Sequence, residues 1–214
     1  MKRPAPTPEN HLIFSAITWV AVSFAGMVLS DAGVYGAKSI VEATALVALV
    51  LLFPDEPRRA WSAWLLAACV ALALAFLAGW LLIYALPNVA DFKFPARANL
   101  RTIDVVAGFV ATGLIAPLFE EKLARHLALR GCAGVIGPAV SRYIHPGIPA
   151  SLIISTIFAL SHPSVMLLAF PFSIVLCVLA LRYEYNFLQR AIIHGLFNSA
   201  VMAWYLTQGF GFQG

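Results

Sequence analysis

Long apolar runs recur along this sequence and constrain its fold more than any other feature. They cover residues 12–30, 39–53, 60–86, 102–130, 148–170, 171–182 and 191–207. A helix needs about 20 mainly apolar residues to cross a bilayer, so the chain has room for roughly six to eight crossings and for no separate soluble domain. We therefore predict an all-α fold, a polytopic transmembrane helical bundle of about seven to eight helices, which forms one integral membrane domain over residues 1–214.

The composition also indicates an integral membrane protein. Hydrophobic residues make up 61% of the chain, charged residues only 11%, and the mean hydropathy is +0.86, outside the usual range of soluble domains. The net charge of +4 does not indicate a nucleic-acid partner, because the basic residues are scattered among the loops. The run 12–30 is long for a signal-peptide core and no clear cleavage site follows it, so we expect a retained first helix.

The cysteines at positions 69, 132 and 177 do not indicate a disulfide framework or a metal site. Two of them lie within apolar runs, the third lies just beyond a helix, and their spacing matches no metal-binding pattern. We expect them to pack as small hydrophobic residues.

Two adjacent carboxylates, Glu120 and Glu121, lie inside the run 102–130, with Arg125 four residues after the second. A charge in the bilayer core costs at least ~2.5 kcal/mol, so some interaction must offset that cost. On a helix, Glu121 and Arg125 share a face and can pair, whereas Glu120 is turned aside. Two neighbouring carboxylates in a low dielectric disfavour double ionisation, so the unpaired Glu120 is suited to proton transfer. Pro117 removes a backbone hydrogen bond just before the doublet, and we expect a kink there.

Three further polar residues lie in the later apolar runs. His162 precedes Pro163, which disfavours helical geometry at His162 and predicts a break in the helix; such breaks are tolerated where they line a cavity. His194 and Asn198 are four residues apart, so they share a helical face and could converge as two donors in an oxyanion hole. Each feature alone has a structural alternative. The Glu-Arg pair could be a structural ion pair, His162 could tie down the backbone at the bend, and His194, four residues after Arg190, could be interfacial.

The order of these motifs resembles a known family. Glu-Glu-x-x-x-Arg, Phe-x-x-x-His and His-x-x-x-Asn follow one another in successive hydrophobic segments, between about residues 102 and 206. This pattern is similar to that of the CAAX-processing and bacteriocin-processing (CPBP, or Abi) family of intramembrane proteases, whose eukaryotic relatives trim prenylated proteins. The resemblance implies a protease-like core over residues 102–207 and an intramembrane glutamic endopeptidase.

The resemblance also implies a role for each polar residue. Glu120, helped by His162, would activate a water for attack on a peptide carbonyl. His194 and Asn198 would stabilise the tetrahedral oxyanion. The ion pair between Glu121 and its partner would orient the site, and the Phe of the second motif would be a packing residue.

The sequence departs from the common family pattern at three positions, Lys122, Ala124 and His126. Family members commonly carry an apolar residue, Phe and Gly at these places. Because the polar site residues are intact, we expect the departures to affect substrate preference more than chemistry.

The depth of the two histidines in the membrane constrains the later helices. One complete crossing over residues 165–181 would place His162 and His194 at opposite membrane faces, where no common site could form. We therefore expect one kinked segment over 148–170, with His162 near mid-depth, followed by a short return over 171–182.

Three other functions fit part of the pattern. A zinc-dependent peptidase could use one Glu and two His as ligands, but the sequence lacks His-Glu-x-x-His and Asn198 is a poor zinc ligand, so we expect no cofactor. A proton-coupled transporter could use a Glu-His relay, but the polar groups cluster in one half of the chain. A non-catalytic immunity or binding protein would not need so many buried polar groups. We expect a multi-pass enzyme of a bacterial cell (inner) membrane that cleaves a membrane-bound protein or peptide.

Overall fold

The computed structural model describes residues 7–54, 56, 60–87 and 101–208. The α-helices in these ranges are α1 (Pro8–Asp31), α2 (Ala37–Leu52), α3 (Ala63–Trp80), α4 (Thr102–Val110), α5 (Ala116–Glu120), α6 (Leu129–Val140), α7 (Gly147–Leu160), α8 (Met166–Arg182) and α9 (Phe187–Gln208). The π-helical segments are η1 (Leu81–Ala85), η3 (Ala111–Ile115) and η4 (Glu121–Ala128), and η5 (Pro163–Val165) is a 3₁₀ turn. Within the described ranges these elements join into seven helices without strands, so the predicted all-α bundle is confirmed.

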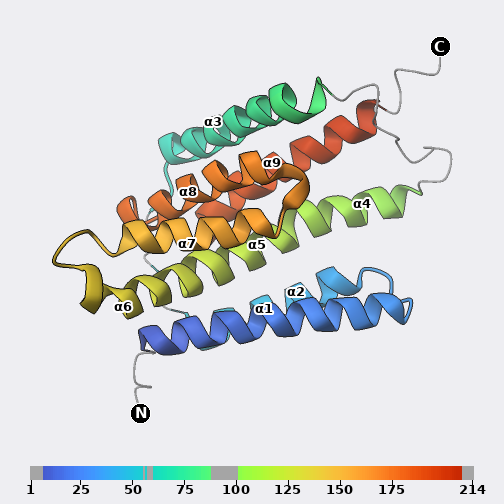
Figure 1. Ribbon diagram of the computed structural model, residues 1–214. Helices are drawn as coiled ribbons and strands as arrows, with labels where there is room; N and C mark the ends of the chain where they lie inside the picture. Colours follow the sequence, from blue (N-terminus) through green and yellow to red (C-terminus); the bar gives the residue numbers. More distant parts are fainter. Residues whose placement is uncertain (1–6, 55, 57–59, 88–100, 209–214) are drawn as a thin grey trace.

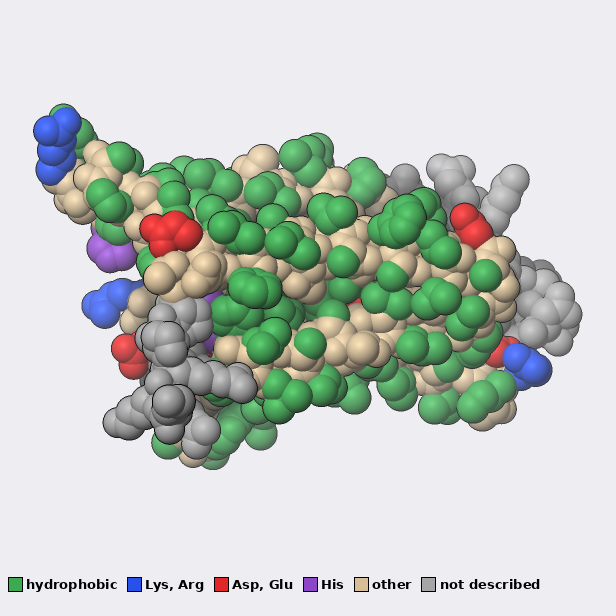
Figure 2. All heavy atoms as spheres, turned by 90° about the horizontal axis from the view of Figure 1, so that it is seen from below, with side chains coloured by type: hydrophobic (Ala, Val, Ile, Leu, Met, Phe, Trp, Pro, Cys, Tyr) green, Lys and Arg blue, Asp and Glu red, His purple; other side chains and the backbone are tan. Residues whose placement is uncertain are grey.

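Length, composition and surface mark the bundle as a membrane protein. Among the residues that the structure describes, four helices are long and apolar enough to cross a bilayer, Pro8–Asp31, Ala63–Ala85, Thr102–Val140 and Pro163–Arg182. Figure 2 shows one face of the molecule, on which hydrophobic side chains cover the flank and charged side chains gather toward the two ends. An apolar flank between two polar ends fits a bilayer, where exposed apolar side chains contact lipid tails.

One long helix organises the bundle and carries the acidic doublet. The elements from α4 to α6 form a continuous helix of 39 residues, here called the central helix, which is about 58 Å long at 1.5 Å per residue. Pro117 cannot donate a backbone hydrogen bond, and the π-helical segment η3 lies immediately before α5, which contains it. The distortion expected near Pro117 therefore takes the form of a π-helical segment. A second one, η4, begins at Glu121.

The other helices pack around the central helix (Figure 1). α1 and α2 form an antiparallel hairpin on one side, with Val22, Leu49 and Phe119 in a shared core. α7, α8 and α9 lie on the other side, and α3 packs against α9. The three cysteines are free, buried and packed in the apolar cores, as expected.

α9 crosses the central helix at two glycines. A Cβ on Gly195 would clash with the carbonyl oxygen of Gly113, and a Cβ on Gly113 would clash with the hydroxyl of Ser199. Small residues let two helix backbones approach closely. The crossing thereby brings the acidic doublet, two turns after Gly113, next to His194, which precedes Gly195.

The boundary predicted between segments 148–170 and 171–182 was wrong. α7 ends before His162 and α8 begins after it, whereas Pro171 lies inside α8. The helix breaks at His162 because Pro163 disfavours helical geometry in the residue before it. The break therefore separates two antiparallel helices, α7 and α8, instead of kinking one.

The expectation that an unbroken α8 would separate His162 from His194 was also wrong. α7 has 14 residues and α8 has 17, so both are much shorter than the central helix. The turn between α7 and α8 consequently lies part-way along the central helix (Figure 1). Phe158, one helical turn before His162, has its ring centroid 6.0 Å from that of His194. A short hairpin thus keeps both histidines close to the same part of the bundle.

Candidate active site

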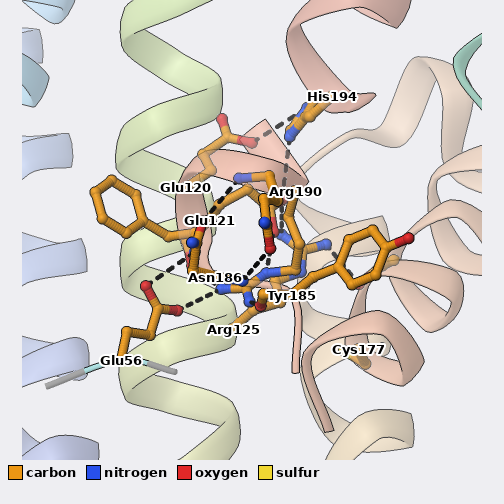
Figure 3. A network of polar contacts seen from close by, with 12 residues as sticks. Glu56, Glu120, Glu121, Arg125, Cys177, Tyr185, Asn186, Arg190 and His194 are labelled. Carbon is orange, nitrogen blue, oxygen red and sulfur yellow. Dashed lines mark hydrogen bonds and ion pairs between the residues drawn. The ribbon is translucent and has the colours of Figure 1, made fainter. Parts of the chain in front are cut away.

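Glu121 is the centre of a fully buried polar network (Figure 3). Its Oε1 lies 3.2 Å from Nη1 of Arg125, one helical turn later, and 3.2 Å from Nδ1 of His194 on α9. Its Oε2 accepts a hydrogen bond of 3.2 Å from Nε of Arg190, also on α9. Both carboxylate oxygens therefore face cationic or donor groups, which offset the cost of burying the charge.

Arg125 is held by partners on two further helices. Its Nη2 donates to the hydroxyl of Ser173 on α8 at 2.8 Å. Its guanidinium lies over the ring of Phe158 on α7, 4.2 Å from the centroid. These contacts fix the guanidinium in one position beside Glu121.

Glu120 has a different environment from its neighbour. Its Oε2 lies 3.8 Å from Nε2 of His194 and has no hydrogen-bond partner within the described part of the chain. The side chain is 15% exposed, whereas that of Glu121 is fully buried. His194 therefore lies between the two carboxylates, with Nδ1 facing Glu121 and Nε2 facing Glu120 (Figure 3).

Glu120 and His162 line one cavity of about 400 Å³, here called the polar pocket. Its walls come from the α1–α2 hairpin, which contributes Trp19 and Glu42, from the central helix, and from the turn between α7 and α8. A water molecule occupies about 30 Å³ in the liquid, so the pocket has room for water and for several peptide atoms. From the wall of the pocket, the Glu120 side chain can therefore contact both a water molecule and a bound peptide.

His162 is held by hydrogen bonds at the end of α7. Its Nδ1 lies 2.8 Å from the carbonyl oxygen of Phe158 and 3.1 Å from the hydroxyl of Ser161. A carbonyl oxygen only accepts, so Nδ1 carries the hydrogen in that bond. In the neutral ring Nε2 is then the acceptor, available to a donor in the polar pocket.

Asn198 bonds to the central helix. Its Nδ2 donates to the carbonyl oxygen of Thr112 at 3.1 Å. In the π-helical register of η3, the amide of Ala116 bonds to the carbonyl of Ala111, so the partner of Thr112 would be residue 117. That residue is proline, which has no N–H, and the amide of Asn198 takes its place. One Nδ2 hydrogen is used in this bond.

Sequence reasoning missed Arg190, Glu56 and Ser173. No role in the site is predicted for Arg190 from the sequence, but its side chain is buried in the network. Its spacing of four residues before His194 could have placed it on the same face of the helix. Glu56 and Ser173 carry no such signal, because their partners are far away in the sequence.

Comparison with known families shows what part of the chain is similar to. Residues 102–200 match the sequence model of a family described as type II CAAX prenyl endopeptidase Rce1-like. The matched segment, 99 of the 214 residues, is similar to this Rce1-like family. The resemblance seen in the three motifs is thereby confirmed, and the matched range contains all three. No curated protein and no solved structure matches the chain.

The match supports a CAAX protease, a hydrolase, as the class of this membrane protein. Its three departures from the family pattern, Lys122, Ala124 and His126, are all buried. Lys122 donates from Nζ to the carbonyl oxygen of Phe53, at the end of α2, at 2.6 Å. Across the described segments, no group of three or more His, Cys, Asp or Glu side chains is arranged to hold a metal ion.

Proposed function

We propose that this Rce1-like protein is an intramembrane glutamic endopeptidase in which Glu120 activates a water. The observation that carries the proposal is the free, buried Oε2 of Glu120, which lies at the wall of the polar pocket, 3.8 Å from His194. A buried carboxylate oxygen without a partner is costly, which favours a functional role for it. A general base must also reach its substrate, and the pocket permits this.

In the proposed reaction, a water in the polar pocket donates one hydrogen to Glu120 and its oxygen attacks the peptide carbonyl carbon. Nε2 of His162 accepts the second hydrogen bond of that water and orients it. The carbonyl oxygen becomes an oxyanion in the tetrahedral intermediate. The C–N bond then breaks, and the leaving amine takes the proton from Glu120.

His194 and Asn198 are the proposed donors to the oxyanion. Nδ1 of His194 is directed at Glu121, so in its protonated form the ring offers Nε2–H to the substrate side. Asn198 has a second Nδ2 hydrogen beyond the one bonded to Thr112. The Glu121–Arg125 pair fixes the tautomer and orientation of His194, as second partners do for catalytic histidines.

The proposed substrate is a membrane-bound protein or peptide with a lipid anchor, of the prenylated kind that the family description names. An apolar groove of about 280 Å³ runs between α1 and α7 and shares Trp19 with the polar pocket. It includes Ala16 and Ile157. A lipid chain in this apolar groove would place the adjoining peptide in the polar pocket. A bacterial cell membrane stays the predicted location.

The proposal is tested by cleavage of a prenylated peptide with the purified protein in liposomes. Glu120→Gln keeps the shape of the side chain but removes the base, so we expect cleavage to be lost while the melting temperature is kept. The control is Glu9→Gln, an exposed position on α1, which should cleave at the wild-type rate. Turnover retained by Glu120→Gln would overturn the mechanism. Activity that is lost in a strong chelator and restored by zinc would favour a metallopeptidase instead.

A further inference from the structure

Arg190 is a buried cation outside the three family motifs, and all three of its guanidinium nitrogens have partners (Figure 3). Nε bonds to Glu121 at 3.2 Å, and Nη2 bonds to Oε1 of Glu56 at 2.9 Å. Nη1 donates to the carbonyl oxygen of Tyr185, just before α9. Arg190 therefore joins the network around Glu121 to a residue from the connection between α2 and α3.

Glu56 fastens that connection to α9. Its Oε2 accepts a hydrogen bond of 2.9 Å from the backbone N–H of Phe187, the first residue of α9, and its Oε1 holds Arg190, one turn later. The side chain is only 5% exposed although it lies in a connection between helices. A carboxylate at a helix N-terminus that also pairs with a buried guanidinium is bound at both oxygens.

A second contact fastens the same connection to the central helix. Lys122, the residue after Glu121, donates from Nζ to the carbonyl oxygen of Phe53 at 2.6 Å. The α2–α3 connection is thus held on one side by the central helix and on the other by α9. These are the two helices that carry Glu121 and His194.

Charges alternate along this chain of contacts. Glu56, Arg190, Glu121 and Arg125 follow one another as acid, base, acid and base, with successive pairs 2.9, 3.2 and 3.2 Å apart. Each buried charge depends on its neighbour, because an unpaired charge in a low dielectric is costly. A change at Glu56 is therefore transmitted through Arg190 to Glu121.

We propose that Arg190 and Glu56 are positioning residues for catalysis: the α2–α3 connection sets the position of Glu121, and hence of His194, through the Glu56–Arg190 ion pair. This inference rests on the proposed function. Neither residue touches the polar pocket, so each acts through Glu121. Part of the catalytic geometry of this chain is then supplied from outside the segment that the family match covers.

The test compares Glu56→Gln and Arg190→Lys with wild type in the liposome cleavage assay. Gln keeps the length of Glu56 but removes its charge, and Lys keeps the charge of Arg190 but replaces the three-nitrogen fork with one ammonium. We expect kcat to fall by about 10- to 100-fold, as small misplacements of catalytic groups do, while KM changes little. The control is Asp104→Asn, which breaks the Arg101–Asp104 ion pair at the far end of the central helix.

The pH profile separates positioning from a merely structural role. The charged groups around His194 are Glu120, Glu121 and Arg125 from the central helix and Arg190 from α9, while α7 and α8 present the rings of Phe158 and Phe172. In the proposed mechanism His194 acts in its protonated form, so loss of its proton sets the alkaline limb of the kcat profile. Glu56→Gln removes a negative charge from this network and leaves it more positive, so the alkaline limb should move to lower pH. Asp104→Asn should leave the profile in place.

The outcomes are distinct from those that test the proposed function. Wild-type kcat in both variants and an unmoved alkaline limb in Glu56→Gln, with Glu120→Gln inactive, would overturn the inference and leave the proposed function standing. Full activity in Glu120→Gln would overturn the proposed function. Glu56→Gln with a lower melting temperature but wild-type kcat and pH profile per folded molecule would make the ion pair structural only, which also overturns the inference.

Discussion

At the scale of single residues, Glu120 and Glu121 have the same side chain in opposite environments. Successive helical residues are turned by about 100°, so one carboxylate points into the network and the other toward the polar pocket. Arg125, four residues later, lies on the face of Glu121 only. Helical spacing alone therefore predicts that Glu121 is neutralised by Arg125 and that Glu120 stays accessible from the pocket.

Arg125→Ala should destabilise the protein strongly, because it removes one of the groups that neutralise the buried Glu121. We expect a loss of about 3–5 kcal/mol in the free energy of unfolding, the usual cost of breaking a buried pair. Ser173→Ala is the matched control, since it removes only the hydrogen bond to the charged Arg125 and should cost less, about 1.5–3 kcal/mol. Denaturant unfolding in detergent measures both. Equal losses in the two variants would contradict the assigned role of the ion pair.

At the scale of elements, the contact between the central helix and α9 sets the distance between the acidic doublet and His194. Gly113 and Gly195 let the two backbones meet, and the amide of Asn198 completes the hydrogen bonding of η3 that Pro117 leaves open. The contact between the two helices thus depends on Pro117, on the π-helical segment η3 and on Asn198 together. In the His-x-x-x-Asn motif, Asn198 therefore bonds to η3, and His194 contacts the network around Glu121.

Gly195→Ala should separate the two helices, because the new methyl group would clash with the backbone carbonyl of Gly113. A rigid backbone cannot yield as a side chain can, so we expect His194 to move and kcat to fall by about 10-fold or more. Gly79→Ala on α3 is the control: its Cβ would meet only the flexible end of Leu168 at an ordinary 3.4 Å. Cleavage rates per folded molecule decide the matter. Wild-type turnover in Gly195→Ala would show that the close crossing is dispensable.

At the scale of the whole molecule, local sequence patterns predicted the helices well but did not predict the contacts between distant residues. Apolar runs predicted the helical bundle because each helix needs only its own sequence to satisfy its backbone in lipid. The α7–α8 boundary was misplaced because the segments were divided to keep His162 and His194 at a common depth, whereas the helix ends before His162 and α8 continues through Pro171. The partnership of Glu56 with Arg190 joins residues 134 positions apart, a pairing that no spacing rule reveals. Packing of the whole bundle decides such contacts.

Filling the apolar groove should discriminate between substrates with and without a lipid chain. Ala16→Trp places a large ring in the groove between α1 and α7, whereas Ile17→Trp on the same helix lies outside the groove, on an exposed face. We expect Ala16→Trp to lower kcat/KM for a prenylated peptide and to leave cleavage of the same peptide without the lipid unchanged. Ile17→Trp should change neither value. An equal loss with both peptides would contradict the assignment of the groove to the lipid.

The α1–α2 hairpin forms one wall of the polar pocket, yet it precedes the segment that the family match covers. The proposed catalytic residues and this wall of the pocket are therefore encoded in separate parts of the sequence. We therefore expect substitutions in the hairpin to change substrate preference without moving the proposed catalytic residues.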